Sequence, residues 1–416
     1  MPLKTLPFRS ADILLPKDNF EKWSVIACDQ YTSRPEYWES VKNTVGDAPS
    51  TLSLIFPEAY LGKGNDEEII ASINAKMTEY LRSDLFCEYK DALIYVERTQ
   101  RDGRVRAGLI GAVDLHEYDF HPDAKCNIRA TERTVMERLP ARVAIRRNAS
   151  IELPHVMMLI DDAKKTVIEP LDRFATKENL LYDFELMQGG GHLRGYLVPQ
   201  SAHSEIFERI SALKTREEQI LFAVGDGNHS LASAKLAHEE NPNDLNRYAL
   251  VELVNLHSDA LDFEPIYRVV ENVDPEEFIA NFEKYLTDGG ATVLTDGDRT
   301  KTAMTFTLVH EKKEKTLRVL NAPHAIAVAC AQEYIDAEIA KSPSIYTDYI
   351  HGEEEVRSLA NRPNTVGFIY DCITKDTLFE GVEKEGVLPR KTFSMGHAHD
   401  KRYYTEARKT KCVILI

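Results

Sequence analysis

The sequence predicts a mixed α/β fold, an α/β part followed by an α+β part, from three observations. Short apolar runs typical of buried strands alternate with segments of helical spacing, an Asp-Gly turn joins two β-rich runs, and a strand–helix–strand pattern surrounds a polar glycine loop. The 416 residues leave room for about two or three domains. We expect an α/β domain over residues 1–270, which contains the glycine loop, and a second α+β domain or layer over residues 271–416.

The first elements alternate between strand and helix. We expect a buried strand over residues 23–28, helices over residues 35–41 and 67–81, and a hairpin of residues 92–98 and 104–115. The hairpin turn contains Asp102-Gly103, a dipeptide that favours tight turns between antiparallel strands. An antiparallel ribbon is therefore expected here.

Two more units follow in the first part. Residues 155–160 and 166–169 predict a second hairpin around Asp161-Asp162. Residues 220–224 predict a strand that enters the glycine loop, and a helix and a strand over residues 248–256 come next, so this stretch predicts a crossover unit.

The second part begins with a strand at residue 265. The pattern after it predicts a helix over residues 275–286, strands over residues 291–294, 304–310 and 317–320, and a helix over residues 325–340.

Composition narrows the class of protein. With 51 Lys and Arg against 67 Asp and Glu, the formal charge is −16, which disfavours a surface that coats nucleic acid or an anionic membrane. No run approaches the roughly 20 apolar residues that span a bilayer, and Pro and Asp interrupt the N-terminal stretch where a signal peptide would need an apolar run. We therefore expect a cytoplasmic protein whose partners are small molecules, with a homo-oligomer compatible with the sequence.

The six cysteines contain no C-x-x-C pair. Neither a disulfide framework nor a zinc ribbon is indicated, so we expect free thiols, no zinc and no haem.

The loop of residues 225–230, Gly-Asp-Gly-Asn-His-Ser, carries the most chemistry. Gly225 and Gly227 allow a ligand to approach the main chain, and the N–H groups that open the following helix form an anion site. Asp226, Asn228, His229 and Ser230 add a carboxylate, an amide, an imidazole and a hydroxyl. The simpler interpretation is that Asp226 or Asn228 only caps the helix and His229 is an exposed first-turn residue.

Several segments resemble one known family, the proteins of domain of unknown function 1015, whose members carry D-G-H-H-R or D-G-N-H-S at this loop. The resemblance extends over most of the chain, to residues 27–31, 108–114, 128–132, 267–268 and 388–391. The loop is also similar to the phosphate-binding signature of the ParB and sulfiredoxin-like fold, whose members bind nucleotides and include free-serine kinases. The resemblance implies a ParB/sulfiredoxin-like mixed-sheet core, and ATP or ADP with Mg²⁺ as the cofactor. Ser230 stands where those relatives usually have Arg, so the cation that would clamp a phosphate must come from elsewhere.

Residues 128–147 are one source of such a cation. They contain six arginines and two acidic residues, Glu132 and Glu137, so their net charge is 6 − 2 = +4. Arginine favours planar, bidentate recognition of phosphate or carboxylate. We therefore expect Arg129, Thr131, Glu132 and Arg142 to contribute to a nucleotide site. The alternative is a solvated helix face, which is what most charge runs are.

The remaining candidates are assigned to substrate binding. They are Gln30 and Tyr31 near the start, Gln188 and His192 of the Gln-Gly-Gly-Gly-His loop, and His257 and Asp259 after the strand of residues 248–256. Strand ends are where open α/β sheets hold ligands.

The leading hypothesis is a small-molecule phosphotransferase or another nucleotide-using enzyme, including a free-serine-kinase-like activity. Asp226 is the first choice as catalytic group and metal ligand, His229 is the second, and Asp29 is expected to face Asp226 if the strands that precede them are parallel. A non-catalytic nucleotide sensor is the second hypothesis. A nicotinamide-dependent oxidoreductase is the third, because the loop satisfies G-x-G-x-x-S, close to the dinucleotide fingerprint.

Overall fold

The computed structural model describes residues 5–28, 31–32, 34–153, 156–294, 303–396 and 398–412. The chain has a mixed α/β fold and divides into two compact units, Met1–Leu261 with Gly396–Ile416, and Asp262–Met395. The boundary that the sequence places near residue 270 falls inside a strand of the second unit, and the last residues of the chain return to the first unit. Within the described residues, none of the helices combines the length and apolar character that a membrane crossing requires.

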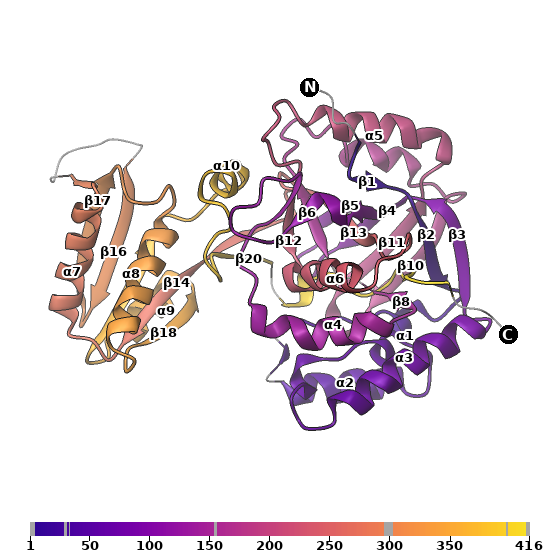
Figure 1. Cartoon of the computed structure of the whole chain (residues 1–416), viewed down its shortest axis with the longest axis horizontal. Coiled ribbons are helices and arrows are strands. Elements are labelled where there is room, and N and C mark those ends of the chain that lie inside the picture. Colours follow the sequence, from indigo (N-terminus) through magenta and orange to yellow (C-terminus); the bar gives the residue numbers. More distant parts are fainter. Residues whose placement is uncertain are drawn as a thin grey trace. The chain divides into compact units, whose positions relative to one another are not determined.

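The first unit is built on one large mixed sheet (Figure 1). In spatial order its strands are β10 (Leu180–Leu186), β11 (Gly191–Leu197), β4 (Ile94–Thr99), β5 (Val105–Asp114), β13 (Tyr248–Asn255), β9 (Met157–Ile160), β12 (Phe222–Asp226), β7 (Ile128–Ala130) and β6 (Tyr118–Asp119), with β1 (Phe8–Arg9) paired to β5. Two short ribbons, β2 (Ala11–Pro16) with β3 (Phe86–Ala92) and β8 (Ile151–Glu152) with β21 (Arg408–Lys409), complete the strands of this unit.

Helices lie on both sides of this sheet in Figure 1. They are α1 (Phe20–Trp23), α2 (Pro35–Val45), α3 (Asp66–Arg82), α4 (Leu139–Asn148), α5 (His203–Ala212) and α6 (Asn228–Glu240). Helix α3 confirms the predicted spacing, since Ile73, Met77 and Tyr80 are buried on one face. Its first turn carries three acidic residues, which favour the positive end of the helix dipole.

The predicted hairpin is confirmed, because β4 and β5 pair antiparallel from Ile94 opposite Ile110 to Thr99 opposite Val105. Gly103 has φ 86° at the turn, a value that glycine adopts without strain. The Gln100 N–H donates to the Arg104 carbonyl at 2.8 Å and closes the turn.

The strand predicted over residues 23–28 is wrong. Trp23 ends α1, and Val25 makes only an isolated bridge with Tyr404. Trp23, Val25 and Ile26 are buried as expected, whereas Ala27 and Cys28 are partly exposed. Thr51 Oγ1 accepts the Val25 N–H at 3.2 Å and donates to the Trp23 carbonyl at 2.8 Å, and the Val25 carbonyl accepts the Tyr404 N–H. The run is therefore irregular, because a side chain and one isolated bridge bind its backbone in place of a neighbouring strand.

The second predicted hairpin is also wrong, although its first strand exists as β9. The Asp162 carboxylate accepts the N–H groups of Thr166 at 2.6 Å and Val167 at 2.8 Å. Hydrogen bonds to a side chain, rather than pairing between two strands, therefore hold this turn. A 3₁₀ helix, η6 (Glu169–Phe174), follows in place of a strand. Strand β9 pairs instead with β12 and β13.

The two strands of the crossover unit predicted around the glycine loop, β12 and β13, are not parallel to each other. β12 runs antiparallel to β9, whereas β13 runs parallel to β9, so β12 and β13 point in opposite directions with β9 between them. The C-terminal ends of β12 and β13 therefore lie at opposite edges of the sheet.

The second unit is an antiparallel sheet with helices, and most of its predicted elements are confirmed. It contains β14 (Phe263–Glu271), α7 (Pro275–Asp288), β15 (Thr292–Val293), β16 (Met304–His310), β17 (Lys313–Leu320), α8 (Ala327–Lys341), β18 (Tyr346–His351), α9 (Glu353–Leu359), β19 (Thr365–Tyr370), α10 (Lys375–Glu385) and β20 (Phe393–Met395). The strand order is β15-β17-β16-β19-β14-β18, with β20 paired to β14. Aromatic rings form its core, among them Phe278, Phe282, Phe306 and Phe368.

Two of the segments that carry the family resemblance meet inside this unit. Arg268 of β14 is fully buried, and its guanidinium donates to the carbonyls of Arg390 and Lys391, both at 3.0 Å. Gln332 of α8 accepts a third bond from Arg268 at 2.7 Å. The Tyr267-Arg268 pair and residues 388–391 thus hold β14, α8 and the chain before β20 together.

A pH-dependent contribution to stability follows from His324, which lies between two carboxylates. Burial lowers the pKa of His324, but hydrogen bonds to Glu333 and to Glu385, the latter at 2.9 Å, outweigh burial and raise it. A raised pKa means that the stabilisation is complete below the unfolded value of about 6.5 and is lost as pH rises through the folded value. We therefore predict that the difference in melting temperature between the wild type and His324→Gln shrinks as pH rises from about 6 to 9. A difference that stays constant over this range would contradict the prediction.

Candidate functional site

The glycine loop lies between β12 and α6, as the sequence predicts. Asp226 is the last residue of β12, and Gly227 takes the left-handed conformation, with φ 85°, as the N-cap of α6. A Cβ on Gly227 would lie 3.0 Å from the Cα of Val156, so a side chain here would be strained in its backbone angle and crowded against Val156. The N-cap residue Gly227 has no side chain that could cap α6.

Asp226 pairs with a residue that sequence reasoning missed. Its Oδ1 accepts the Gly227 N–H at 2.9 Å, and its Oδ2 lies 3.5 Å from the Nζ of Lys401. Both side chains are partly accessible, with 23% of Asp226 and 14% of Lys401 exposed, so a ligand can reach them. Lys401 therefore places an ammonium group beside the loop that contains Ser230. No local pattern marks Lys401, because the residue belongs to the C-terminal segment that returns to the first unit.

Tyr404 connects Asp226 with two other predicted regions. Burial raises the pKa of Tyr404 above its usual range; Arg142 opposes that rise, whereas Cys28 and Asp226 add to it. The Tyr404 N–H also donates to the Val25 carbonyl at 2.9 Å. This bond joins the C-terminal segment that carries Lys401 to the chain four residues before Asp29, whereas Asp29 and Gln30 themselves lie outside the described residues.

Tyr31, the next described residue, is buried in an aromatic stack. Its ring lies parallel to that of Tyr37 with centroids 3.7 Å apart, and its carbonyl accepts the Trp38 indole N–H at 3.0 Å. Contacts within its own segment therefore hold Tyr31.

His229 fastens the first turn of α6 to the segment before η5 (Met136–Arg138). Its Nε2 accepts the Val135 N–H at 3.0 Å, which requires that nitrogen to be unprotonated.

Thr131 Oγ1 donates to the Val224 carbonyl at 2.7 Å, beside the parallel pairing of β7 with β12. Thr131 therefore has a structural contact here, while Asn228 Oδ1 is buried and accepts no hydrogen bond from the described residues.

Arg142 donates to the Arg138 carbonyl at 2.9 Å, and its charge opposes the rise in the pKa of Tyr404. Arg129 is buried and donates to the carbonyls of Cys126 and Glu218, both at 3.0 Å, so its guanidinium holds backbone. Arg146 pairs with Glu152 at 2.6 Å, and Arg147 with Glu240 at 2.8 Å. Much of the charge run is thus neutralised within the fold.

Gly225, Glu132 and Ser230 are partly exposed in or next to the loop.

The Gln-Gly-Gly-Gly-His loop has a structural reason for its glycines. A Cβ on Gly190 would lie 2.4 Å from the Tyr403 hydroxyl, and one on Gly191, with φ 85°, would lie 2.0 Å from the Thr99 carbonyl oxygen. Gln188 exchanges hydrogen bonds with Ser40. The loop is therefore shaped around Tyr403 of the C-terminal segment.

His192, His257 and Asp259 do not join Asp226. His192 lies on β11 between Asp183 and Glu185, whose hydrogen bonds outweigh burial and raise its pKa. His257 pairs with Asp161 at 2.7 Å, and Asp259 lies 3.5 Å from Lys165. Because β13 and β12 point in opposite directions, His257 and Asp259 lie at the other edge of the sheet.

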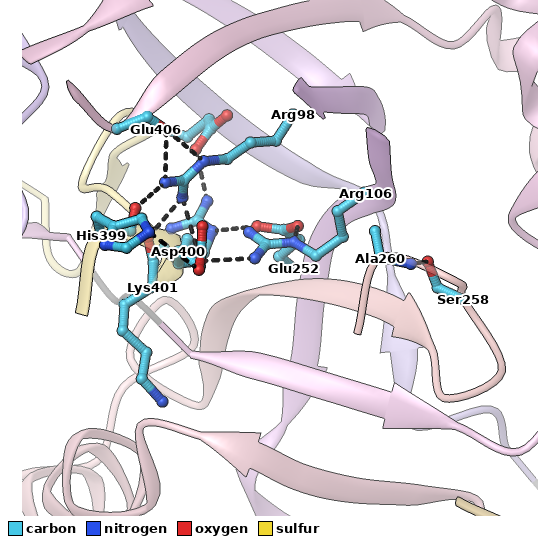
Figure 2. Close-up of polar contacts among 11 residues, drawn as sticks. Arg98, Arg106, Glu252, Ser258, Ala260, His399, Asp400, Lys401 and Glu406 are labelled. Carbon is cyan, nitrogen blue, oxygen red and sulfur yellow. Dashed lines mark hydrogen bonds and ion pairs between the residues drawn. The ribbon is translucent and has the colours of Figure 1, made fainter. Parts of the chain in front are cut away.

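A buried ionic network underlies the C-terminal segment (Figure 2). Glu252 of β13 lies 3.4 Å from Arg106 and 3.0 Å from Arg402, and Arg402 also donates to Glu406 at 2.5 Å. Burial raises the pKa of Glu252, but Arg106 and Arg402 outweigh it and lower the pKa. Burial and the charge of Arg106 lower the pKa of Arg98 to about 10.

Within the described part of the chain, no group of three or more His, Cys, Asp or Glu side chains is arranged to hold a metal ion. Mg²⁺ needs no such group, since it binds through one or two carboxylates together with the phosphates of its nucleotide. Within the loop of residues 225–230, Asp226 is the residue that carries a carboxylate. All six cysteines are free thiols.

The chain was compared with known proteins. The model of the family "Protein of unknown function (DUF1015)" matches residues 6–343. No curated protein matches significantly.

Similar solved structures include three proteins of low sequence identity. A mutant free serine kinase in complex with ADP is 14% identical, with 73% of this chain and 92% of that chain covered and a TM-score of 0.40. A conserved hypothetical protein from Pyrococcus furiosus is 11% identical, with coverages of 71% and 93% and a TM-score of 0.36. A C-terminally truncated SbnI from Staphylococcus aureus is 10% identical, with coverages of 69% and 82% and a TM-score of 0.37.

The loop geometry predicts different costs for an added methyl group at two glycines. Gly227 and Gly103 have nearly the same φ, 85° and 86°, but a Cβ on Gly103 meets nothing within 4 Å. We predict that Gly103→Ala lowers the free energy of unfolding by about 1–2 kcal/mol, the cost of the left-handed conformation. Gly227→Ala should cost more, because its Cβ must also displace Val156. Urea unfolding of both variants measures the difference, and equal costs would contradict the close contact.

Proposed function

We propose that this chain, which belongs to the DUF1015 family, is a nucleotide-using enzyme that transfers a phosphoryl group to the hydroxyl of a small molecule. One observation carries the proposal. A carboxylate, an ammonium group and the N-terminus of a helix come together at Asp226, Lys401 and the first turn of α6. This combination suits an anionic phosphate ligand and a hydroxyl that must lose a proton.

In this proposal the first turn of α6 binds a phosphate of the nucleotide. Its backbone N–H groups and the positive end of the helix dipole favour an anion, and Gly227 lets the ligand approach the main chain. The Lys401 ammonium turns from Asp226 to the phosphate, and Arg142 adds positive charge from the side of Tyr404. A bound Mg²⁺ ion would neutralise further phosphate charge.

Asp226 then has a free carboxylate for the reaction. The substrate oxygen attacks the terminal phosphorus, the bond from that phosphorus to the leaving nucleotide breaks, and the hydroxyl proton passes to Asp226. His229 remains neutral through its bond with Val135 and keeps the helix start in place. A free amino acid with a side-chain hydroxyl is the substrate class suggested by the similarity of the loop to that of free-serine kinases.

The first test of this proposal is Asp226→Asn. We predict that wild-type protein with Mg²⁺ and ATP forms ADP and a phosphorylated substrate in a screen of small hydroxyl compounds that includes serine, and that Asp226→Asn loses at least 100-fold in rate. The exposed Asp84, which pairs with Lys17, provides the matched control Asp84→Asn, expected to retain the rate. Wild-type turnover in Asp226→Asn would overturn the assigned role. Nucleotide binding without turnover in the wild type would favour a sensor instead.

Lys401 is tested by its effect on nucleotide affinity. We predict that Lys401→Ala weakens ATP binding by about 10- to 150-fold, the scale of about 1.5–3 kcal/mol for a hydrogen bond to a charged group. Lys409→Ala removes a lysine of the same segment that pairs with Glu88 at 2.9 Å, and it should leave the affinity unchanged. Calorimetric titration measures both. Equal affinities in the wild type and Lys401→Ala would show that the phosphate does not contact Lys401.

A further inference from the structure

Two buried arginines bind the backbone of the C-terminal segment at three consecutive residues. Arg98 of β4 donates to the carbonyls of His399 and Lys401, the latter at 2.5 Å, and Arg106 of β5 donates to the carbonyl of Asp400 at 2.8 Å. Both arginines are only 2% exposed. Figure 2 shows the two guanidinium groups beside the backbone of residues 399–401.

These bonds restrict the backbone from which the Lys401 side chain projects. A carbonyl that must accept a hydrogen bond sets the plane of its peptide group, and three such groups in succession leave the backbone little freedom. The carbonyls of residues 399–401 are held on the arginines, and in Figure 2 the Lys401 side chain points away from them. Its ammonium ends 3.5 Å from the Asp226 carboxylate.

Arg98 also binds the Gln-Gly-Gly-Gly-His loop of residues 188–192. Its Nε and Nη2 donate to the Gly190 carbonyl at 3.2 and 2.8 Å, and the guanidinium lies over the Tyr403 ring at 5.0 Å. One planar group with five donors therefore serves the carbonyls of Gly190, His399 and Lys401 together. A lysine at position 98 would bring one compact ammonium group and could not span them in the same plane.

We propose that Arg98 and Arg106 are positioning residues that aim Lys401 at Asp226. Their charges are not assigned to ligand binding, because the Arg98 guanidinium donates to backbone carbonyls and that of Arg106 donates to the Asp400 carbonyl and lies 3.4 Å from Glu252. The positioning of the ammonium is independent of any ligand, while its consequence for nucleotide affinity rests on the proposed function.

The test is zero-length cross-linking with a carbodiimide, which joins a carboxylate to an amine in direct contact. In wild-type protein without ligand, mass spectrometry should find the Asp226–Lys401 link and, further along the same segment, the Glu88–Lys409 link. In Arg98→Lys we expect the yield of the Asp226–Lys401 link to fall at least fivefold while that of Glu88–Lys409 stays the same. An unchanged Asp226–Lys401 yield, or an equal fall of both links, would overturn the proposal.

Arg408→Lys is the matched control. Arg408 is a buried arginine of the same segment, and it pairs with Glu152 at 2.6 Å and lies next to Lys409. We expect this variant to reduce the Glu88–Lys409 link and to preserve the Asp226–Lys401 link. If Arg98→Lys does not fold, Arg106→Lys, which removes the bond to the Asp400 carbonyl, replaces it with the same expected result.

A second measurement connects position to binding. Arg98→Lys should weaken ATP binding when Lys401 is present and add no further loss in Lys401→Ala, since it acts through that side chain. Losses that add in the double variant would overturn the positioning role. If wild-type protein binds no nucleotide, only the proposed function fails, because the cross-links are measured without ligand.

Discussion

The buried ion pairs between the large sheet and the C-terminal segment are the interaction on which the first unit depends. Glu252 in the middle of β13 faces Arg106 from β5 and Arg402 from the end of the chain, and Arg402 continues to Glu406. Burying such charges is costly, and removing one partner from a buried pair typically costs about 3–5 kcal/mol. The C-terminal segment must therefore lie where Arg402 can pair with both Glu252 and Glu406. This requirement determines the path of the chain after the second unit.

The consequences of that placement extend along the whole segment. Tyr403 fills the space left by Gly190, Tyr404 bridges to Val25, and Arg408 reaches Glu152 of β8. Lys401 is the member of the segment that turns toward the loop. A segment with the appearance of a terminal tail thus acts as a core element and contributes a side chain to the candidate site.

The mixed direction of the strands separates the polar residues into two groups. Asp226 and His257 follow β12 and β13, but these strands run in opposite directions on either side of β9. The glycine loop therefore does not share an edge with His257 and Asp259. Its neighbours are the residues next to β7, the helix α4 and the C-terminal segment, so Lys401 lies beside Asp226 while His192 and His257 remain in separate ion pairs.

By itself, the sequence determined the features that depend on neighbours along the chain. Helical spacing identified α3, α7 and α8, and alternation with the Asp102-Gly103 turn identified the β4–β5 hairpin. The glycines of residues 225–227 indicated a backbone that a ligand can approach, and Gly227 has φ 85°. Periodicity and turn geometry are local properties, so they can be read locally. Trp23, Val25 and Ile26 were correctly expected to be buried, but burial does not specify whether the backbone finds a strand or the Thr51 hydroxyl as its partner.

Only the tertiary structure decided the direction of β12, the return of the C-terminus and the partner of Asp226. A strand carries the same alternation whether it runs parallel or antiparallel, so no pattern in residues 222–226 specifies which neighbour it takes. Lys401 resembles any other lysine in the sequence, and its role arises from Arg98 and Arg106, which hold the carbonyls of residues 399–401 inside the fold. The physical reason is that buried charges and hydrogen-bonding groups find their partners in residues far apart in the chain. The local spacing of residues does not predict those partners.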